Sequence, residues 1–372
     1  MKAFLYSLLL LFFTQQVLAQ DKELSDLAQI SVLTVGTGPE LHELFGHTAI
    51  RVNDPMQGID RVYNFGMFAF STPNFALRFV KGDMKYFVVY TPMRNFVMSY
   101  VYDNRSVYEQ VLNLTSAQKE DIWHKLNEAL KEENKYYVYK FIDQNCTTKV
   151  VDIVNSATNT IVNAEVPANN KSYRSIFNDY LTDSYFLKLG INMILGARID
   201  EVNDKQFLPD KYMQGLEKTV VDGHPIVSET VTLFSADPNL TSKASWWDSL
   251  WFFSLLCVII GFLGKNYRII RKVYFFILGS LGVLFAFVTL YSDHIEILRN
   301  NIILLCSPLF LVFMFLSNGS KIYKILYIIS LIGLGLYIVL NVFSERLLIT
   351  LPLFLLTLFF LIIDKRQNKL II

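Results

Sequence analysis

The hydrophobic and polar positions of this 372-residue chain divide it into two parts of different character. As far as about Ser245, charged residues are scattered among apolar ones, as in a water-soluble globular protein. After Trp246 the chain is almost continuous Leu, Ile, Val and Phe. The pattern predicts a water-soluble domain over residues 20–245 and a membrane domain over residues 246–372.

The first 19 residues have the pattern of a secretory signal peptide. Lys2 supplies a short basic region, an apolar run extends from Phe4 to Phe13, and the segment ends at the small residue Ala19. We expect cleavage after Ala19, with an uncleaved anchor as the alternative. Both alternatives export the domain that follows.

Short runs rich in β-branched and aromatic residues predict the strands of the exported domain, at residues 30–35, 49–52, 61–65, 86–90 and 107–114. Pro55 and Gly58 break the chain between the second and third runs, which are therefore expected to pair as an antiparallel hairpin. Thr115 and Gln118 form a capping-box pattern that opens a helix. Further helical patterns follow Cys146 and span residues 173–189. Strands and helices together predict an α+β domain.

Two stretches of the exported domain have a less definite pattern. Aromatic residues are dense between Gly66 and Tyr102, which favours either the core of a sheet or an apolar groove or membrane-facing patch for acyl chains. Residues 190–238 show no regular period, and we expect them to be irregular.

The membrane domain contains five apolar runs, which predict five helices at residues 249–263, 273–290, 302–316, 325–340 and 347–363. Several of these runs are shorter than the roughly 20 residues that a helix needs to cross the core of a bilayer. Lys and Arg are concentrated in the loops after the first, third and fifth runs. Because basic loops stay in the cytoplasm, the first run enters the membrane from outside, in agreement with an exported first domain.

The net charge and the positions of the cysteines limit the kinds of ligand and reaction that the chain is expected to have. The formal net charge is +1, so no overall field draws the chain to nucleic acid. Cys257 and Cys306 lie within apolar runs, which leaves Cys146 as the one cysteine of the exported domain. An unpaired thiol in an oxidising compartment is either buried and inert or a reactive nucleophile. The chain has neither a C-x-x-C nor an H-E-x-x-H motif, so we expect no metal and no cofactor.

A reactive role for Cys146 is favoured by its position at the start of a predicted helix, where the helix dipole stabilises a thiolate. An imidazole beside it would lower the thiol pKa further and later protonate the leaving group. His47 is the best candidate because it precedes a predicted strand, and His42 is the competitor. The backbone N–H of Cys146 would help to hold an oxyanion.

A third polar group usually orients the imidazole of such a pair. Asn64, on the strand that returns from the hairpin, is our candidate for this role. Tyr63 and Asp143 are the alternatives.

Longer motifs carry a resemblance to a known family. A histidine on a strand followed by Asn145-Cys146 at a helix start resembles the circularly permuted branch of the papain-like NlpC/P60 superfamily, which includes lecithin–retinol acyltransferase. Residues 38–40, 44–52, 63–66 and 145–148 are similar to the Lnb family of bacterial lipoprotein N-acyltransferases, which have a periplasmic Cys/His domain and a helical membrane tail.

This resemblance implies a permuted papain-like periplasmic domain on a bacterial inner-membrane protein with several membrane passes. It also implies acyl transfer through Cys146, His47 and Asn64, with a glycerolipid as acyl donor and the N-terminal diacylglyceryl-cysteine of a lipoprotein as acceptor. The expected substrate-binding residues are Asn145, Tyr63 and His294. His294 lies in a loop on the same side of the membrane as Cys146, and it either lines a lipid headgroup site or is an ordinary loop histidine.

Two other classes of function remain open at this point. A membrane-anchored cell-wall amidase or peptidase would use the same Cys/His pair, although it would not need five membrane segments. A non-catalytic lipid-binding membrane protein would leave Cys146 without a chemical role.

Overall fold

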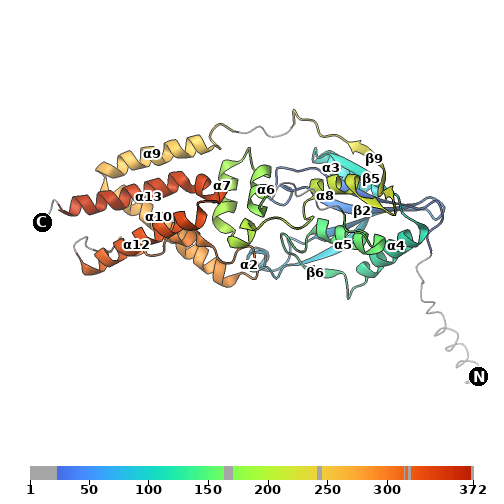
Figure 1. Ribbon diagram of the computed structural model, residues 1–372, viewed down its shortest axis with the longest axis horizontal. Coiled ribbons are helices and arrows are strands. Elements are labelled where there is room, and N and C mark those ends of the chain that lie inside the picture. The colour runs from blue at the N-terminus through green and yellow to red at the C-terminus, as the bar shows by residue number, and fades with distance from the viewer. Residues whose placement is uncertain (1–22, 163–170, 241–244, 314, 317–319, 370–372) are drawn as a thin grey trace, which may run out of the picture.

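The computed structural model describes residues 23–162, 171–240, 245–313, 315–316 and 320–369, so the predicted signal peptide lies outside the described residues. Figure 1 shows a sheet domain at one end of an elongated molecule and a bundle of long helices at the other. The sheet domain mixes strands and helices, which confirms the α+β class that the sequence predicts.

One antiparallel sheet of seven strands organises the first domain, in the order β6-β4-β3-β2-β1-β5-β9. Its strands are β1 (Gln29–Val35), β2 (His47–Asp54), β3 (Ile59–Met67), β4 (Lys85–Pro92), β5 (Val107–Leu112), β6 (Tyr136–Val138) and β9 (Val227–Phe234). A separate pair consists of β7 (Val220–Val221) and β8 (His224–Pro225). The predicted hairpin is formed by β2 and β3, with Ala49 opposite Asn64.

Helices cover both faces of the sheet. Side chains alternate between the two faces of each strand, so a strand can contribute to two cores. On one face, α4 (Ser116–Leu130), α5 (Cys146–Thr158) and α8 (Pro209–Lys218) close a core that includes Ile50 and Tyr63. On the other face, α3 (Met93–Tyr102) closes a smaller core that includes Ala49 and Val62. The capping box of Thr115 and Gln118 begins α4 as the sequence predicts.

The prediction that residues 190–238 are irregular is wrong, because they contain α8 and β9. Strand β9 pairs with β5 at the edge of the sheet, and most of its side chains are exposed or half-buried. An edge strand of this kind carries little hydrophobic alternation, so it is recognised by its pairing partner and not by its own sequence.

A helical connection joins the sheet domain to the membrane helices, and consists of α6 (Tyr173–Tyr180), α7 (Tyr185–Ile194) and the 3-10 helix η2 (Ala197–Asp200). The buried side chains of α7 belong to the same core as those of the membrane helices. The Tyr185 hydroxyl donates a hydrogen bond to the Ile349 carbonyl, with an O···O distance of 2.8 Å. Contact with the membrane domain therefore begins well before residue 246, where the composition of the chain changes.

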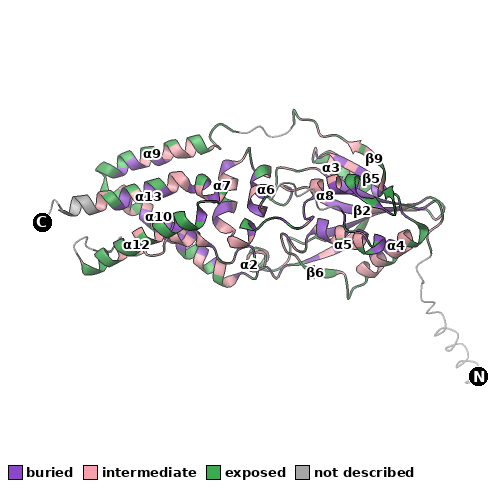
Figure 2. Cartoon of the chain, viewed as in Figure 1, coloured by how far each residue is buried: buried purple, intermediate pink, exposed green. Residues whose placement is uncertain are grey.

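The bundle contains α9 (Leu250–Asn266), α10 (Arg268–Tyr291), α12 (Lys321–Asn341) and α13 (Glu345–Lys369). Of these described helices, α10, α12 and α13 are long and apolar enough to cross a membrane, whereas the 17-residue α9 is shorter. Figure 2 shows many exposed positions on the outward faces of α9 and α12, where their side chains are apolar.

The five predicted membrane helices are not confirmed, because the third apolar run does not form one helix. It contains the short helices η3 (Asn301–Leu304) and α11 (Phe310–Phe313), with Pro308 between them. Irregular backbone at membrane depth is tolerated where protein covers it. A β-carbon on Gly282 of α10 would lie 1.9 Å from the Cys306 carbonyl oxygen, so glycine permits the direct contact that covers this break.

Candidate active site

Cys146 is the first residue of α5, and Asn145 fixes the start of that helix. The Asn145 side-chain oxygen accepts the Thr148 N–H at 2.9 Å, and the Thr148 hydroxyl accepts the Asn145 N–H at 2.9 Å. The Asn145 amide also donates to the carbonyls of Phe141 and Phe207, at 3.0 and 2.9 Å. Asn145, which the resemblance suggested as a substrate-binding residue, is buried and uses its side chain to hold Cys146 in place.

His47 is the first residue of β2, directly after a glycine that the backbone requires. Gly46 has φ +80°, and a β-carbon there would lie 2.5 Å from the Val35 carbonyl oxygen. The hydroxyls of Thr48 and Thr147 are 3.0 Å apart and hydrogen bonded. Because these threonines directly follow His47 and Cys146, the bond joins strand and helix beside the imidazole and the thiol.

The register of the β2–β3 pair places Asn64 beside His47. Asn64 lies opposite Ala49, so it is the diagonal neighbour of His47 on the same face of the sheet. His47 Nε2 and Asn64 Oδ1 are 3.3 Å apart. The Asn64 amide nitrogen donates to the Val62 carbonyl and the Thr91 hydroxyl, each at 3.2 Å, which leaves its oxygen to face the imidazole. This network assigns the hydrogen to Nε2 of the neutral ring and leaves Nδ1 to accept a proton.

The surroundings of Cys146 lower the pKa of its thiol. Burial raises the pKa of the Cys146 thiol, but the charge of His47 and a hydrogen bond from its ring outweigh that effect, together with the Thr48 N–H and the Thr147 hydroxyl. The net pKa of the thiol is lowered. Cys146 as a whole is half-buried.

Three buried tyrosines lie near enough to Cys146 for its charge to influence their pKa values, and nothing in the sequence distinguishes them from other aromatic residues. Burial raises the pKa of Tyr100 to about 12 and that of Tyr137 and Tyr139 further, and a thiolate at Cys146 adds to each increase. Their hydroxyls therefore stay protonated and can donate hydrogen bonds. The Tyr137 hydroxyl lies 3.8 Å from the position of a β-carbon on Gly66, which in turn lies 3.4 Å from Cys146 Cβ. Tyr137 and Tyr139 belong to an aromatic run at residues 136–141, whose sequence predicts a short strand or extended segment and not a site, and Tyr100 lies on α3.

The other residues considered from the sequence lie in different surroundings. Tyr63 is buried on the sheet face opposite to Asn64 and donates a hydrogen bond to Asn127 at 3.2 Å. Asp143 forms an ion pair with Lys205. His42 is exposed, and its ring lies 6.0 Å from that of Phe68. Of the three candidates for the group that orients the imidazole, which are Asn64, Tyr63 and Asp143, Asn64 is the one that contacts His47. Among the described residues, no cluster of His, Cys, Asp and Glu could hold a metal ion.

His294 connects the loop after α10 to the segment that carries Cys146. It is only 2% exposed, its ring stacks on Phe141 at 4.5 Å, and its Nε2 donates to the Phe79 carbonyl at 3.1 Å. Burial lowers the pKa of His294, which keeps the ring neutral. In the same loop, Glu296 accepts the Ile142 N–H at 3.3 Å. The loop therefore supports the residues before Cys146, and His294 is not exposed to a ligand in this structure.

A pocket of about 460 Å³ lies where the helical connection meets the bundle, and Cys146 and His47 do not line it. Apolar walls from Tyr185, Leu250 and Leu348 face polar groups that include Lys188 and Asp248. The pocket is separate from the Cys/His site.

Comparison with known proteins supports a relation to one family. Residues 16–179 match the family described as the Lnb N-terminal periplasmic domain, a range that includes His47, Asn64 and Cys146. No curated protein and no solved structure matches the chain. The match supports an Lnb-type membrane protein with a periplasmic N-terminal domain, and the helices that are apolar enough to cross a membrane agree with it.

Proposed function

We propose that the protein is a lipoprotein N-acyltransferase of the bacterial inner membrane that uses Cys146 as its nucleophile. The observation that carries the proposal is the arrangement of Cys146, His47 and Asn64. A thiol of lowered pKa at a helix start contacts an imidazole whose second nitrogen is held by an amide oxygen. This is the arrangement that thiol-dependent acyl transfer needs.

In the first step, the Cys146 thiolate attacks an ester carbonyl of a glycerolipid. The C–S bond forms and the C–O ester bond breaks. The protonated His47 gives its proton to the departing oxygen, which leaves as the hydroxyl of a lysolipid. The acyl chain is then held on Cys146 as a thioester.

In the second step, the α-amine of the diacylglyceryl-cysteine attacks the thioester carbonyl. The C–N bond forms, the C–S bond breaks and Cys146 returns to the thiolate, while His47 takes the proton that the amine releases. A hydrogen bond from the Cys146 N–H, supplemented by the Tyr137 hydroxyl, stabilises the oxyanion in both steps. Exclusion of water favours the amine over hydrolysis.

The architecture suits substrates that stay in a bilayer. Both donor and acceptor are lipids, and the candidate site belongs to a domain that packs directly on apolar helices. Lys and Arg are clustered at the ends of α10 and α12 that lie away from the sheet domain. These clusters agree with a multi-pass topology that has the N-terminal domain in the periplasm. The order of His47 before Cys146 is that of a permuted papain-like domain, which we retain as part of the proposal.

The test is N-acylation by the full chain reconstituted in bilayers that contain a phospholipid with an isotopically labelled acyl chain. A synthetic diacylglyceryl-peptide with a free amine serves as acceptor, and mass spectrometry detects the labelled amide. We expect the amide with the native chain and none with Cys146→Ser. Cleavage of muropeptides without the amide would favour a cell-wall amidase, and an unchanged acceptor with lipid bound would favour a non-catalytic lipid-binding protein.

A further inference from the structure

One continuous segment, residues 66–81, runs from the candidate nucleophile to the membrane domain. At its start, Gly66 lies against Cys146, since a β-carbon added to the glycine would lie 3.4 Å from Cys146 Cβ. At its end, the Lys81 carbonyl accepts the Asp293 N–H at 2.6 Å. Asp293 is the second residue after the end of α10, so the segment extends from the neighbourhood of Cys146 to the periplasmic end of a helix that is long enough to cross a membrane.

Aromatic rings form a row along this segment. Phe68 contacts Phe70 with ring centroids 4.8 Å apart and Phe75 at 5.8 Å. Phe75 stacks on Phe79 at 6.4 Å, and Phe79 reaches His294 of the membrane-domain loop at 6.4 Å. The row of rings therefore extends from Phe68, two residues after Gly66, to the loop that follows α10.

The outer side of the segment is apolar and uncovered in the described structure. Its helix, α2 (Phe75–Lys81), has no buried residue. Phe70 is 68% exposed, Leu77 54% and Met67 40%. A seven-residue helix is too short to be stable alone in water, and exposed apolar residues gathered in one place mark an interaction site.

The position and charge of the segment indicate that the lipid bilayer covers its exposed apolar residues. Helix α2 packs against α10, and Figure 1 shows it at the end of α10 that faces the sheet domain, where the bilayer surface lies. Arg78 and Lys81 carry the charge of its last turn, and both approach the single carboxylate of Asp83. By helix geometry, the exposed Leu77 lies beside Lys81 and on the side of α2 opposite to Phe75 and Phe79. An exposed leucine with a basic residue next to it is suited to the interface of an anionic membrane.

We propose that residues 66–81 lie in the outer leaflet of the membrane and that a lipid acyl chain follows their row of rings to reach Cys146. The proposed insertion into the leaflet is supported by the exposure and the position of the segment. The proposed acyl path rests on the proposed function, because an acyl chain follows the rings to Cys146 only if Cys146 accepts acyl chains from a lipid.

The insertion is tested with the full chain in nanodiscs of phosphatidylcholine and phosphatidylglycerol. A polarity-sensitive fluorophore is attached at Phe70→Cys or Leu77→Cys in a Cys146→Ser background. Met56→Cys is the matched control, because Met56 is equally apolar and 70% exposed but lies in the turn at the far end of β2 from His47. We expect blue-shifted emission and quenching by spin-labelled lipids at positions 70 and 77, and neither at position 56. Emission at 70 and 77 like that at 56 would overturn the insertion, as would shielding that appears only when acceptor lipopeptide is added.

The acyl path is tested by Phe70→Asp in the native Cys146 background, because Phe70 belongs to the row of rings and is 68% exposed. We expect a loss of about tenfold in kcat/KM for phospholipid, from the apolar contact removed, and an unchanged rate of Cys146 acylation by a water-soluble short-chain ester. Met56→Asp is the control and should change neither rate. An unchanged rate with phospholipid would overturn the path. Quenching at 70 and 77 with no amide formed by the native chain would leave the insertion standing and contradict the proposed function.

Discussion

At the scale of single residues, the candidate site depends on three side chains whose partners are already in place. Asn64 holds His47 through Nε2, and His47 lowers the pKa of Cys146 against the effect of burial. Each interaction makes a separate prediction for the chemistry of the sulfur.

The first prediction concerns the pH dependence of Cys146. A lowered thiol pKa means that the thiolate persists as pH falls below the usual thiol range, so alkylation by iodoacetamide stays fast at neutral pH. His47→Ala removes the largest lowering influence, and the alkylation rate at pH 7 falls about tenfold for each pKa unit regained. The measurement is the alkylation rate against pH, with Cys146→Ser as the blank. An unchanged midpoint in His47→Ala would contradict the assigned contact.

The second prediction concerns Asn64 as a positioning residue. Asn64→Ala leaves His47 free to rotate, and we expect kcat to fall about 100-fold, within the range of general acid–base catalysis, with KM for phospholipid little changed. The pH midpoint of Cys146 alkylation should rise as well, which a purely structural loss would not cause. Thr91→Val is the control, since Asn64 keeps its bond to the Val62 carbonyl, and it should have a much smaller effect.

At the scale of secondary structure elements, much of the site could be predicted from the sequence. Strong propensity predicts the strand after His47 and the helix after Cys146, and hairpin geometry then brings Asn64 close to His47. The tyrosines near Cys146 could not be predicted, because Tyr137 and Tyr139 arrive through the pairing of β6 with β4 and Tyr100 arrives on α3, which packs on the sheet. The capping role of Asn145 could not be separated from substrate binding, since a cap and a substrate contact use the same residue types.

A third prediction tests the turn that places His47. Gly46→Ala puts a β-carbon at positive φ and 2.5 Å from the Val35 carbonyl oxygen, so we expect the strand start to shift and acylation to be lost. Gly58→Ala is a matched control, with φ +65° and nothing within 4 Å, and should cost about 1 kcal/mol of stability with activity retained. Thermal melting and the acylation rate are measured for both. Full activity in Gly46→Ala would show that the turn does not position His47.

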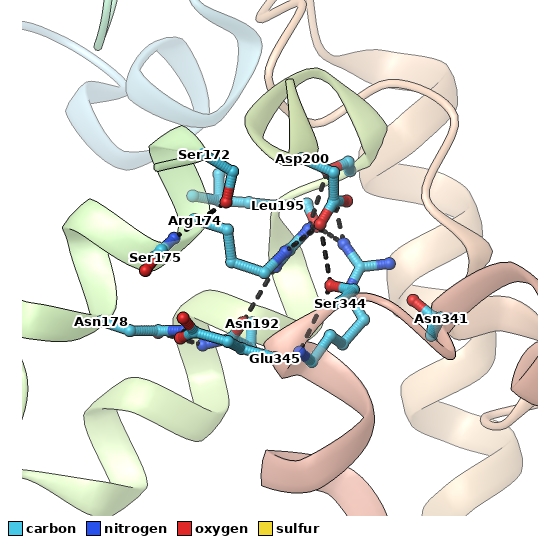
Figure 3. A network of polar contacts seen from close by, with 12 residues as sticks. Ser172, Arg174, Ser175, Asn178, Asn192, Leu195, Asp200, Asn341, Ser344 and Glu345 are labelled. Carbon is cyan, nitrogen blue, oxygen red and sulfur yellow. Dashed lines mark hydrogen bonds and ion pairs between the residues drawn. The ribbon is translucent and has the colours of Figure 1, made fainter. Parts of the chain in front are cut away.

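At the scale of the whole molecule, a polar network around the buried Arg174 joins the helical connection to the membrane helices (Figure 3). Arg174 donates to both Asp200 oxygens, at 2.7 and 2.9 Å, and to Asn192 at 2.9 Å. Ser344, just before α13, donates to Asp200 at 2.8 Å. Burial raises the pKa of Asp200, but its hydrogen bonds to Arg174 and the charge of Arg174 outweigh that effect. The net pKa is lowered, so the carboxylate stays charged. Hydropathy predicted the two parts of the chain, but not this joint, because its members are far apart in sequence.

The fourth prediction addresses this joint. Arg174→Met removes a guanidinium that is almost fully buried and leaves several acceptors without it, so we expect a loss of about 3 kcal/mol and a lower Tm in detergent. Arg198→Met, on η2 nearby, breaks a more exposed ion pair with Glu201 and should cost less than about 1 kcal/mol. Equal Tm values for the two variants would contradict the stabilising role of the network.

The most direct test of the central claim is the detection of an acyl group on Cys146. The full chain in phospholipid nanodiscs, without an acceptor, is digested and the peptide that contains Cys146 is weighed by mass spectrometry. The account predicts an added acyl mass that hydroxylamine removes, that disappears when the diacylglyceryl-peptide is supplied, and that is absent in His47→Ala. Formation of the amide product with Cys146 unmodified, or by the Cys146→Ser chain, would contradict it.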